Sequence, residues 1–469
     1  MVRVRSILVS AGALAWTAAP AVANHPADFV KALTPWFQNN DFGPAEKLFL
    51  PEARTAGRNQ LLYLYEMANL YRMRGDLDKS IELFADADRV AHQYEGKAIL
   101  SASGAASQAG ATLTNDTLLP WEGATADKVM ARTLDAINYL LKADLEDATV
   151  EVRKAEEYQV REREKRQKTV SKAAAMSAAA SAKYGEMFSY VQDVRNSYEN
   201  AFTYYLSSQI YRAQGPSGLD DGLVDIKRAY ELSPRSPAVR TAYLDLTAQA
   251  QGPAALADQQ RRLGVPSGPQ LPDPARTGTV VVVFETGFVP PLSEVSIDVL
   301  AEDKLISMAF PIYRQFGPPQ PSLRISGPGL EQATTLAVDL RRLEVKALQE
   351  RMPEILLRGT AGAIAKVQAQ NKATKTFGLF GQLASIVATK VVTVADLRSW
   401  LSLPAEVQTA QFTLPAGPAD LSLASYDWTE RLGLQVTAGG TTFLLVRAAP
   451  GFHSLKTVAL PPVGPVDMN

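Results

Sequence analysis

The chain has 469 residues, 46% of them hydrophobic, and its 48 lysines and arginines nearly balance 49 aspartates and glutamates, giving a net charge of −1. A chain this close to neutral has no general basic field, so nucleic acid is not expected as a partner. The sequence holds no cysteine, which excludes disulfides, thiolate metal sites and cysteine nucleophiles. Its three histidines are far apart in sequence, so we expect no metal site and no cofactor.

The first 23 residues predict a secretory signal peptide. Arg3 and Arg5 give a basic start, residues 7–19 are apolar or small, and Ala21-Val22-Ala23 is typical of a cleavage site. The apolar stretch is too short to span a bilayer comfortably. We therefore expect export and a periplasmic location.

Residues 24–263 predict a domain of tetratricopeptide-type helical repeats, because helix-forming residues dominate and apolar positions recur at helical spacing. In a repeat of about 34 residues, small side chains stand where two antiparallel helices touch, and a tight turn joins the helices. Three units follow one frame, with turns expected at Gly75, Ala143 and Gly215. The first unit is carried by Leu64, Met67, Ala68, Tyr71, Gly75-Asp76, Ser80, Phe84 and Ala87.

Repeats of this kind stack into a curved solenoid whose concave face is the usual binding groove. The first and third units are expected to bring amides suited to a peptide backbone and arginines suited to a carboxylate. The predicted binding residues are Tyr65, Asn69, Arg72, Tyr205, Gln209 and Arg212. In the middle unit Ile137 and Leu140 predict an apolar patch instead. The alternative is that such side chains are merely exposed, or packed under the neighbouring insertions between the repeats.

A stretch rich in glycine and proline, residues 264–276, predicts a linker, and residues 277–469 predict a β-rich domain with a helical insertion. Gly439-Gly440 predicts a tight hairpin between strands at 434–437 and 441–447. The expected fold class is therefore α+β, with all-α tetratricopeptide-type repeats first and the β-rich domain second.

An apolar run covers residues 377–392, but it is short for a membrane span and Gln382 and Lys390 interrupt it. We interpret it as a core element of the β-rich domain. The alternative is an exposed element that makes a peripheral contact with a membrane or a partner.

Catalytic motifs are not found in the sequence. It has no Gly-x-Ser-x-Gly, no His-Glu-x-x-His and no phosphate-binding Gly-x-x-x-x-Gly-Lys. Acid pairs such as Asp220-Asp221 and Glu156-Glu157 are adjacent, so on a helix their side chains do not face each other. We therefore expect that the protein is not an enzyme.

Two motifs lie outside the repeat frame, Trp121-Glu122-Gly123 and Arg398-Ser399-Trp400. They are interpreted as aromatic anchors that dock irregular segments on their domains, with a contact site for a partner as the alternative. Together with several further short sequence motifs, these two motifs make the chain resemble a bacterial family of repeat-containing envelope proteins, mostly uncharacterised and often lipoproteins. The further blocks are Leu113-Thr114-Asn115-Asp116, Lys128-Val129-Met130, residues 134–140, residues 150–155 and Leu403-Pro404.

The resemblance implies an envelope location, and the lack of a cysteine to lipidate implies a freely periplasmic protein. We expect a scaffold or adaptor that binds another envelope protein through the repeat groove. The alternative is a membrane-associated envelope assembly factor that uses residues 377–392 as its contact.

Overall fold

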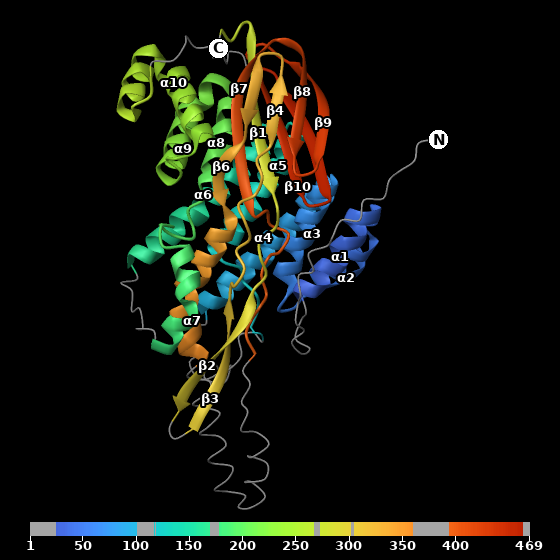
Figure 1. Ribbon diagram of the computed structural model, residues 1–469, viewed down its shortest axis with the longest axis vertical. Helices are drawn as coiled ribbons and strands as arrows, with labels where there is room; N and C mark the ends of the chain where they lie inside the picture. Colours follow the sequence, from blue (N-terminus) through green and yellow to red (C-terminus); the bar gives the residue numbers. More distant parts are fainter. Residues whose placement is uncertain are drawn as a thin grey trace, which may run out of the picture.

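The computed structural model describes residues 25–100, 117, 119–168, 178–266, 273–301, 304–359 and 394–462. The predicted signal peptide and the apolar run 377–392 lie outside the described residues. Helices occupy the chain as far as Leu263, strands begin at Thr277, and one helix at 340–359 is inserted among the strands (Figure 1). The predicted α+β class is confirmed.

Three pairs of consecutive helices pack closely and lie where the sequence predicts the repeat units: α3 with α4, α5 with α6, and α8 with α9. The helices are α1 His25–Asn39, α2 Gly43–Arg54, α3 Gln60–Arg74, α4 Leu77–Leu100, α5 Thr125–Leu141, α6 Leu145–Lys168, α7 Ala178–Tyr190, α8 Ala201–Ala213, α9 Leu219–Leu232 and α10 Pro237–Leu263.

The turns between the paired helices fall where the repeat frame places them. Gly75 ends α3 in the left-handed region with φ 103°, and its N–H donates to the carbonyls of Tyr71 and Arg72. The second turn places Ala143 at φ 58°, a conformation in which a Cβ is strained. The third turn has Gly215 at φ 76°.

Within the described ranges the strands form three sheets. The largest has the order β11-β10-β1-β7-β6, a second has the order β5-β4-β8-β9, and β2 and β3 form a separate two-stranded ribbon. The strands are β1 Thr277–Thr286, β2 Ser293–Ala301, β3 Lys304–Ile312, β4 Arg324–Gly327, β5 Leu330–Ala333, β6 Thr335–Asp339, β7 Glu406–Pro415, β8 Gly417–Ser425, β9 Trp428–Val436, β10 Thr441–Ala449 and β11 Phe452–Leu460.

The predicted hairpin at Gly439-Gly440 is wrong. β9 pairs with β8 in the four-stranded sheet, whereas β10 lies in the five-stranded sheet between β11 and β1, parallel to β1. The physical reason is burial, since every residue of β10 is buried. A strand covered on both faces belongs in the middle of a sheet that has a layer on each side.

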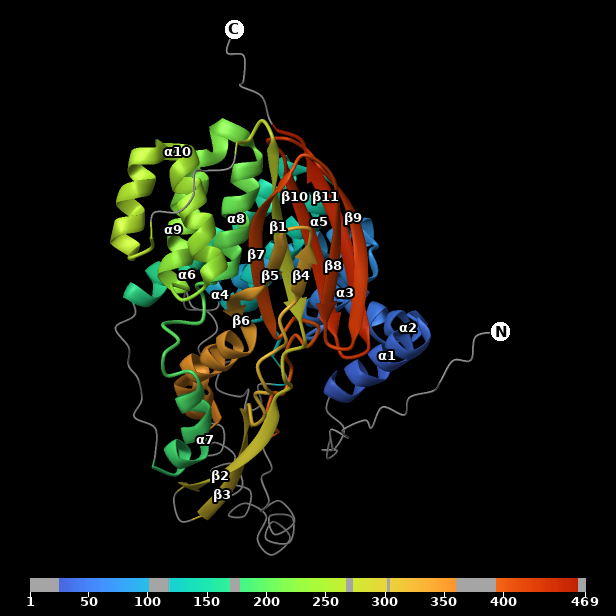
Figure 2. The ribbon, with the colours of Figure 1, turned by 45° about the horizontal axis from the view of Figure 1, so that its top comes forward.

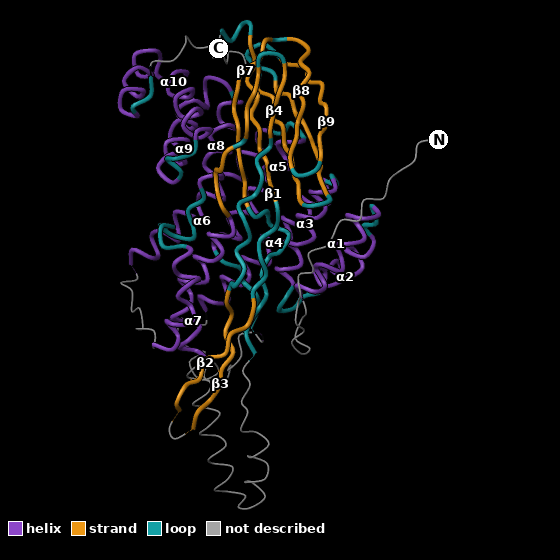
Figure 3. The backbone as a smooth tube through the Cα atoms, viewed as in Figure 1, coloured by secondary structure: helices purple, strands orange, loops and turns teal. Residues whose placement is uncertain are grey.

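The five-stranded sheet is that middle layer (Figure 2). On β1, Val281 and Val283 face the helices, while Val280 and Val282 face the four-stranded sheet. The molecule is thus built as helices, sheet and second sheet. The tube view shows the strands gathered against the inner side of the helical array, with the ribbon β2–β3 extending from one end (Figure 3).

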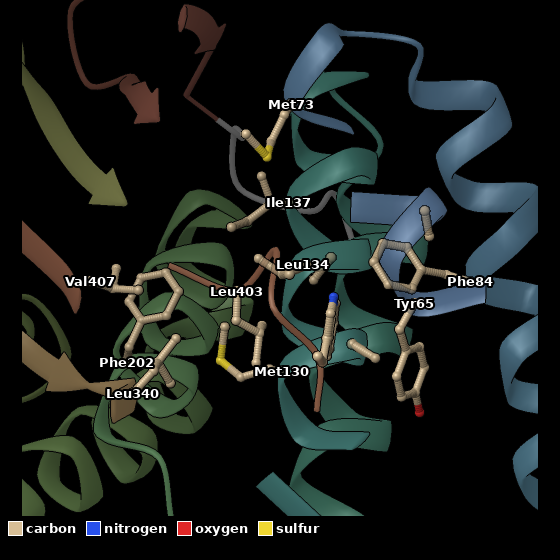
Figure 4. Packing of buried hydrophobic residues seen from close by; sticks show 14 of the residues in the cluster. Tyr65, Met73, Phe84, Met130, Leu134, Ile137, Phe202, Leu340, Leu403 and Val407 are labelled. Carbon is tan, nitrogen blue, oxygen red and sulfur yellow. The ribbon is translucent and has the colours of Figure 1, made fainter. Parts of the chain in front are cut away.

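The main hydrophobic core belongs to both halves of the chain. Figure 4 shows helical side chains packed with side chains that follow them by more than a hundred residues in sequence. The labelled members are Tyr65, Met73, Phe84, Met130, Leu134, Ile137 and Phe202 from the helices and Leu340, Leu403 and Val407 from the second half. A separate smaller core joins α7, the ribbon β2–β3 and the helix at 340–359.

Candidate functional site

The six predicted groove residues lie on α3 and α8 as the repeat frame requires, but none is open to solvent. The largest exposed fraction among them is 6%, at Arg72 and Arg212. Tyr65, Asn69 and Arg72 contact the second half of the same chain, whereas Arg212 contacts Asp245 of α10. The groove is therefore filled from within the molecule, by the irregular segment 394–405 at one end and by the five-stranded sheet at the other.

Asn69 and Tyr65 bind the segment 394–405. The Asn69 side-chain amide donates to the carbonyl of Ser402 at 2.8 Å and contacts its hydroxyl at 3.2 Å. The Tyr65 ring stacks on the ring of Trp400, with centroids 4.7 Å apart and planes 25° apart. The amide thus contacts a peptide backbone, as its chemistry predicted, and that backbone belongs to this chain.

Glu66 completes this contact, and the sequence reasoning missed it. Its two carboxylate oxygens accept from the backbone N–H groups of Leu401 at 2.7 Å and Ser402 at 3.0 Å. Glu66 is fully buried. A carboxylate that accepts two N–H donors is well compensated for its loss of water. The available signal was an acidic residue inside the apolar sequence of α3, three positions before Asn69.

Arg72 binds a carboxylate, again one from this chain. Its two Nη atoms reach the two oxygens of Glu285 on β1 at 2.9 and 2.5 Å, and its Nε donates to Asn69 Oδ1 at 3.0 Å. Both charged side chains are buried. The bidentate geometry fixes the angle between α3 and the five-stranded sheet.

The third repeat meets the far edge of the same sheet with fewer hydrogen bonds. Arg212 Nη1 donates to Asp245 Oδ2 at 2.8 Å, and Gln411 of β7 donates to the same oxygen at 2.8 Å. Among the described residues, Arg212 Nε and Nη2 and Gln209 Oε1 have no hydrogen-bond partner. Tyr205 is fully buried, and burial raises the pKa of its hydroxyl well above the usual range. Water molecules commonly bridge such buried polar groups.

The middle repeat contributes the predicted apolar patch. Ile137 and Leu140 are completely buried and pack in the main core. This repeat therefore adds hydrophobic contact to the polar contacts made by the repeats on either side.

Trp121 and Arg398 anchor the segment 394–405 at its entrance to the groove. The Trp121 indole donates to the Arg398 carbonyl at 3.2 Å. The Arg398 guanidinium donates to Asn59 Oδ1 at 3.0 Å and to the carbonyls of Arg58 and Leu119 at 3.3 and 3.1 Å. Both tryptophan motifs therefore hold irregular segments in place, but Trp400 docks on the helical half rather than on its own β-rich half.

Two buried carboxyls in the repeats have strongly raised pKa values. Burial raises the pKa of Asp135 to about 7, with Glu151 adding to the rise, although Asn138 donates to it. Burial likewise raises the pKa of Asp225 to about 7, although the Ser207 hydroxyl donates to it at 2.5 Å. Each carboxyl is thus bonded to an amide or hydroxyl within the helical half.

Comparison with known protein families and with characterised proteins gives no match. Over the described ranges, no helix combines the length and the apolar character needed to cross a membrane. In the same part of the chain, no three histidine or acidic side chains gather closely enough to hold a metal ion.

Proposed function

We propose that this protein is a scaffold or adaptor of the bacterial cell envelope, exported to the periplasm, that binds another envelope protein. The observation that carries the proposal is the exposure of apolar side chains on outer helices, with Val224 67% and Leu357 65% exposed. The groups suited to recognition, Asn69, Glu66 and Arg72, join the two halves of the chain into one body with a shared core. The signal-peptide pattern and the resemblance to repeat-containing envelope proteins support the location.

A filled groove changes where the partner has to bind. Displacing the segment 394–405 would expose Trp400 and leave Glu66 buried without its N–H donors, which is strongly unfavourable. The partner surface is therefore expected on an outer face. Exposed apolar side chains offer candidate positions there, among them Val150 on α6, 42% exposed, Val224 on α9, 67% exposed, and Leu357 on the helix at 340–359, 65% exposed.

Site-specific photo-crosslinking tests the proposal. A photoreactive amino acid would replace Val150, Val224 or Leu357 in the full chain, with exposed Thr429 on β9 as the matched control. The expected result is a crosslink to one periplasmic or outer-membrane protein from one face and none from the control. Equal background labelling from all four positions would contradict the scaffold proposal, and mass spectrometry of the mature N-terminus would test export in the same sample.

A membrane-associated assembly factor is the second candidate, and one observation favours it. Both ends of the undescribed stretch 360–393 are attached beside the ribbon β2–β3, away from the main core. At one end, Gly359 lies so close to Phe310 that a Cβ on the glycine would be 2.8 Å from its ring. At the other, the Ala395 N–H donates to Glu294 Oε2 at 3.4 Å.

Vesicle co-sedimentation separates the two candidates. Full-length protein and a variant lacking residues 377–392 would be mixed with anionic phospholipid vesicles, and their folding would be compared by circular dichroism. The scaffold proposal expects neither protein to sediment with vesicles. Sedimentation that is lost in a folded deletion variant would favour the assembly factor.

A further inference from the structure

A small cavity lies at the end of the groove, where α3 and α5 meet β1, β10 and β11. Its volume is about 20 Å³, and its charged lining consists of Arg72, Glu285, Arg447 and Lys456. A space of this size holds one water molecule or one ion of similar radius.

The charges around the cavity do not balance. Three cationic side chains surround one carboxylate, and Glu285 is already engaged by both Nη atoms of Arg72. Arg447 Nε lies 3.9 Å from Glu285 Oε2, beyond hydrogen-bond distance. The carboxylate of Asp76 also attracts the Lys456 ammonium group, but the Asp76 side chain is 35% exposed and forms an ion pair with Arg74. The cavity is therefore lined by excess positive charge.

The cations also have unused N–H groups. The Nη atoms of Arg447 donate to the carbonyls of Ala448 and Gly287 at 2.7 and 2.6 Å, while its Nε has no hydrogen-bond partner among the described residues. Lys456 Nζ donates to the Arg72 carbonyl at 3.0 Å, which uses one of the three donors of an ammonium group. Both side chains line the same cavity.

Arg447 is buried and Lys456 is half-buried, so a shortage of negative charge around them is unfavourable and lowers their pKa values. Burial, together with Arg72, lowers the pKa of Arg447 to about 10 and that of Lys456 to about 8. A water molecule in the cavity would accept hydrogen bonds but bring no charge. An anion would supply both the acceptor and the missing negative charge.

We infer that this cavity is a binding site for a small monovalent anion of about the size of chloride, held by Arg447 Nε and Lys456 Nζ. A volume of about 20 Å³ has room for one monatomic ion. The bound anion would join β10 and β11 to the end of α3. This inference is independent of the proposed function, because the cavity does not include the surfaces proposed for a partner.

The test uses two measurements on the full mature protein. Thermal unfolding would be followed at constant ionic strength while chloride replaces gluconate, an anion too large for the cavity. We expect a saturable rise in Tm, since a ligand that binds only the folded state stabilises it. Crystals grown in sodium bromide should show an anomalous peak within hydrogen-bond distance of Lys456 Nζ and Arg447 Nε.

Matched variants separate specific binding from a general salt effect. Lys456→Met removes a cavity donor while keeping an apolar stem, and Lys227→Met removes one charge from the exposed surface of α9. The chloride-dependent shift in Tm should disappear in the first and remain in the second. An equal shift in both variants, or a wild-type bromide crystal with only water in the cavity, would overturn the inference, and the crystal decides even if Lys456→Met fails to fold.

Discussion

Replacing Trp400 by alanine removes the largest side chain that the second half places in the groove. Trp400 is 1% exposed, stacks on Tyr65 at 4.7 Å, meets Phe84 edge-on at 6.4 Å and donates from its indole to Ser402 Oγ at 2.8 Å. A buried tryptophan replaced by alanine costs about 3–5 kcal/mol. The aromatic stacking and the lost hydrogen bond place the expected loss in the upper part of that range.

Urea unfolding followed by the helical circular dichroism signal measures this loss. Trp400 lies far from the helices in sequence, so its removal destabilises them only if the groove is filled as described. Trp428→Ala is the control, because Trp428 is half-buried beside His453 on the outer sheet. We expect the control to cost about 1–2 kcal/mol in proportion to its smaller buried area. Helices that unfold at an unchanged urea concentration in Trp400→Ala would refute the filled groove.

Three further predictions concern charged residues. Arg72→Met leaves Glu285 buried without its bidentate partner and should cost about 3–5 kcal/mol in urea unfolding. Adding Glu285→Gln to this variant should restore part of the lost stability. If the losses of the two single variants simply add in the double variant, the two side chains are not a direct pair. Burial raises the pKa of Asp225 to about 7, so the native state keeps a proton that the unfolded chain releases near pH 4. The free energy of unfolding should therefore fall as pH rises from about 4 to about 7. Asp225→Asn should reduce the slope of this decrease by at most about 1.4 kcal/mol per pH unit. A slope that is the same in the variant and the wild type would show that Asp225 ionises normally. The chloride-dependent rise in Tm should shrink above about pH 8, where Lys456 loses its charge, and a rise that persists at pH 9 would contradict a role for Lys456. The other charged groups that act on Lys456 are Arg72, Glu285 and Asp76.

The positions of the groove residues were predictable from sequence, but the segment that fills the groove was not. Apolar spacing and the Gly75 turn locate α3, and the same frame places Asn69 and Arg72 one turn apart on one face. Their chemistry was also foreseen, since one binds a backbone carbonyl and the other a carboxylate. The spacing within a repeat carries no information about which distant segment fills the groove.

The arrangement of the strands was less predictable, because it depends on which layers cover them. β10 is an unbroken run of buried residues, and its neighbours in the sheet are set by long-range packing rather than by the glycine turn before it. β11 was missed in the sequence. It lies at the edge of the sheet, and His453, Ser454 and Lys456 interrupt its apolar pattern.

Hydrogen exchange at Leu401 and Ser402 tests the central claim most directly, because their N–H groups donate to the buried carboxylate of Glu66. If the chain fills its own groove, these amides exchange as slowly as those of α3, although they lie outside any helix or strand. Exchange at the rate of an unstructured peptide, while α3 remains protected, would show that the groove is open. The groove would then again be a candidate surface for partner binding.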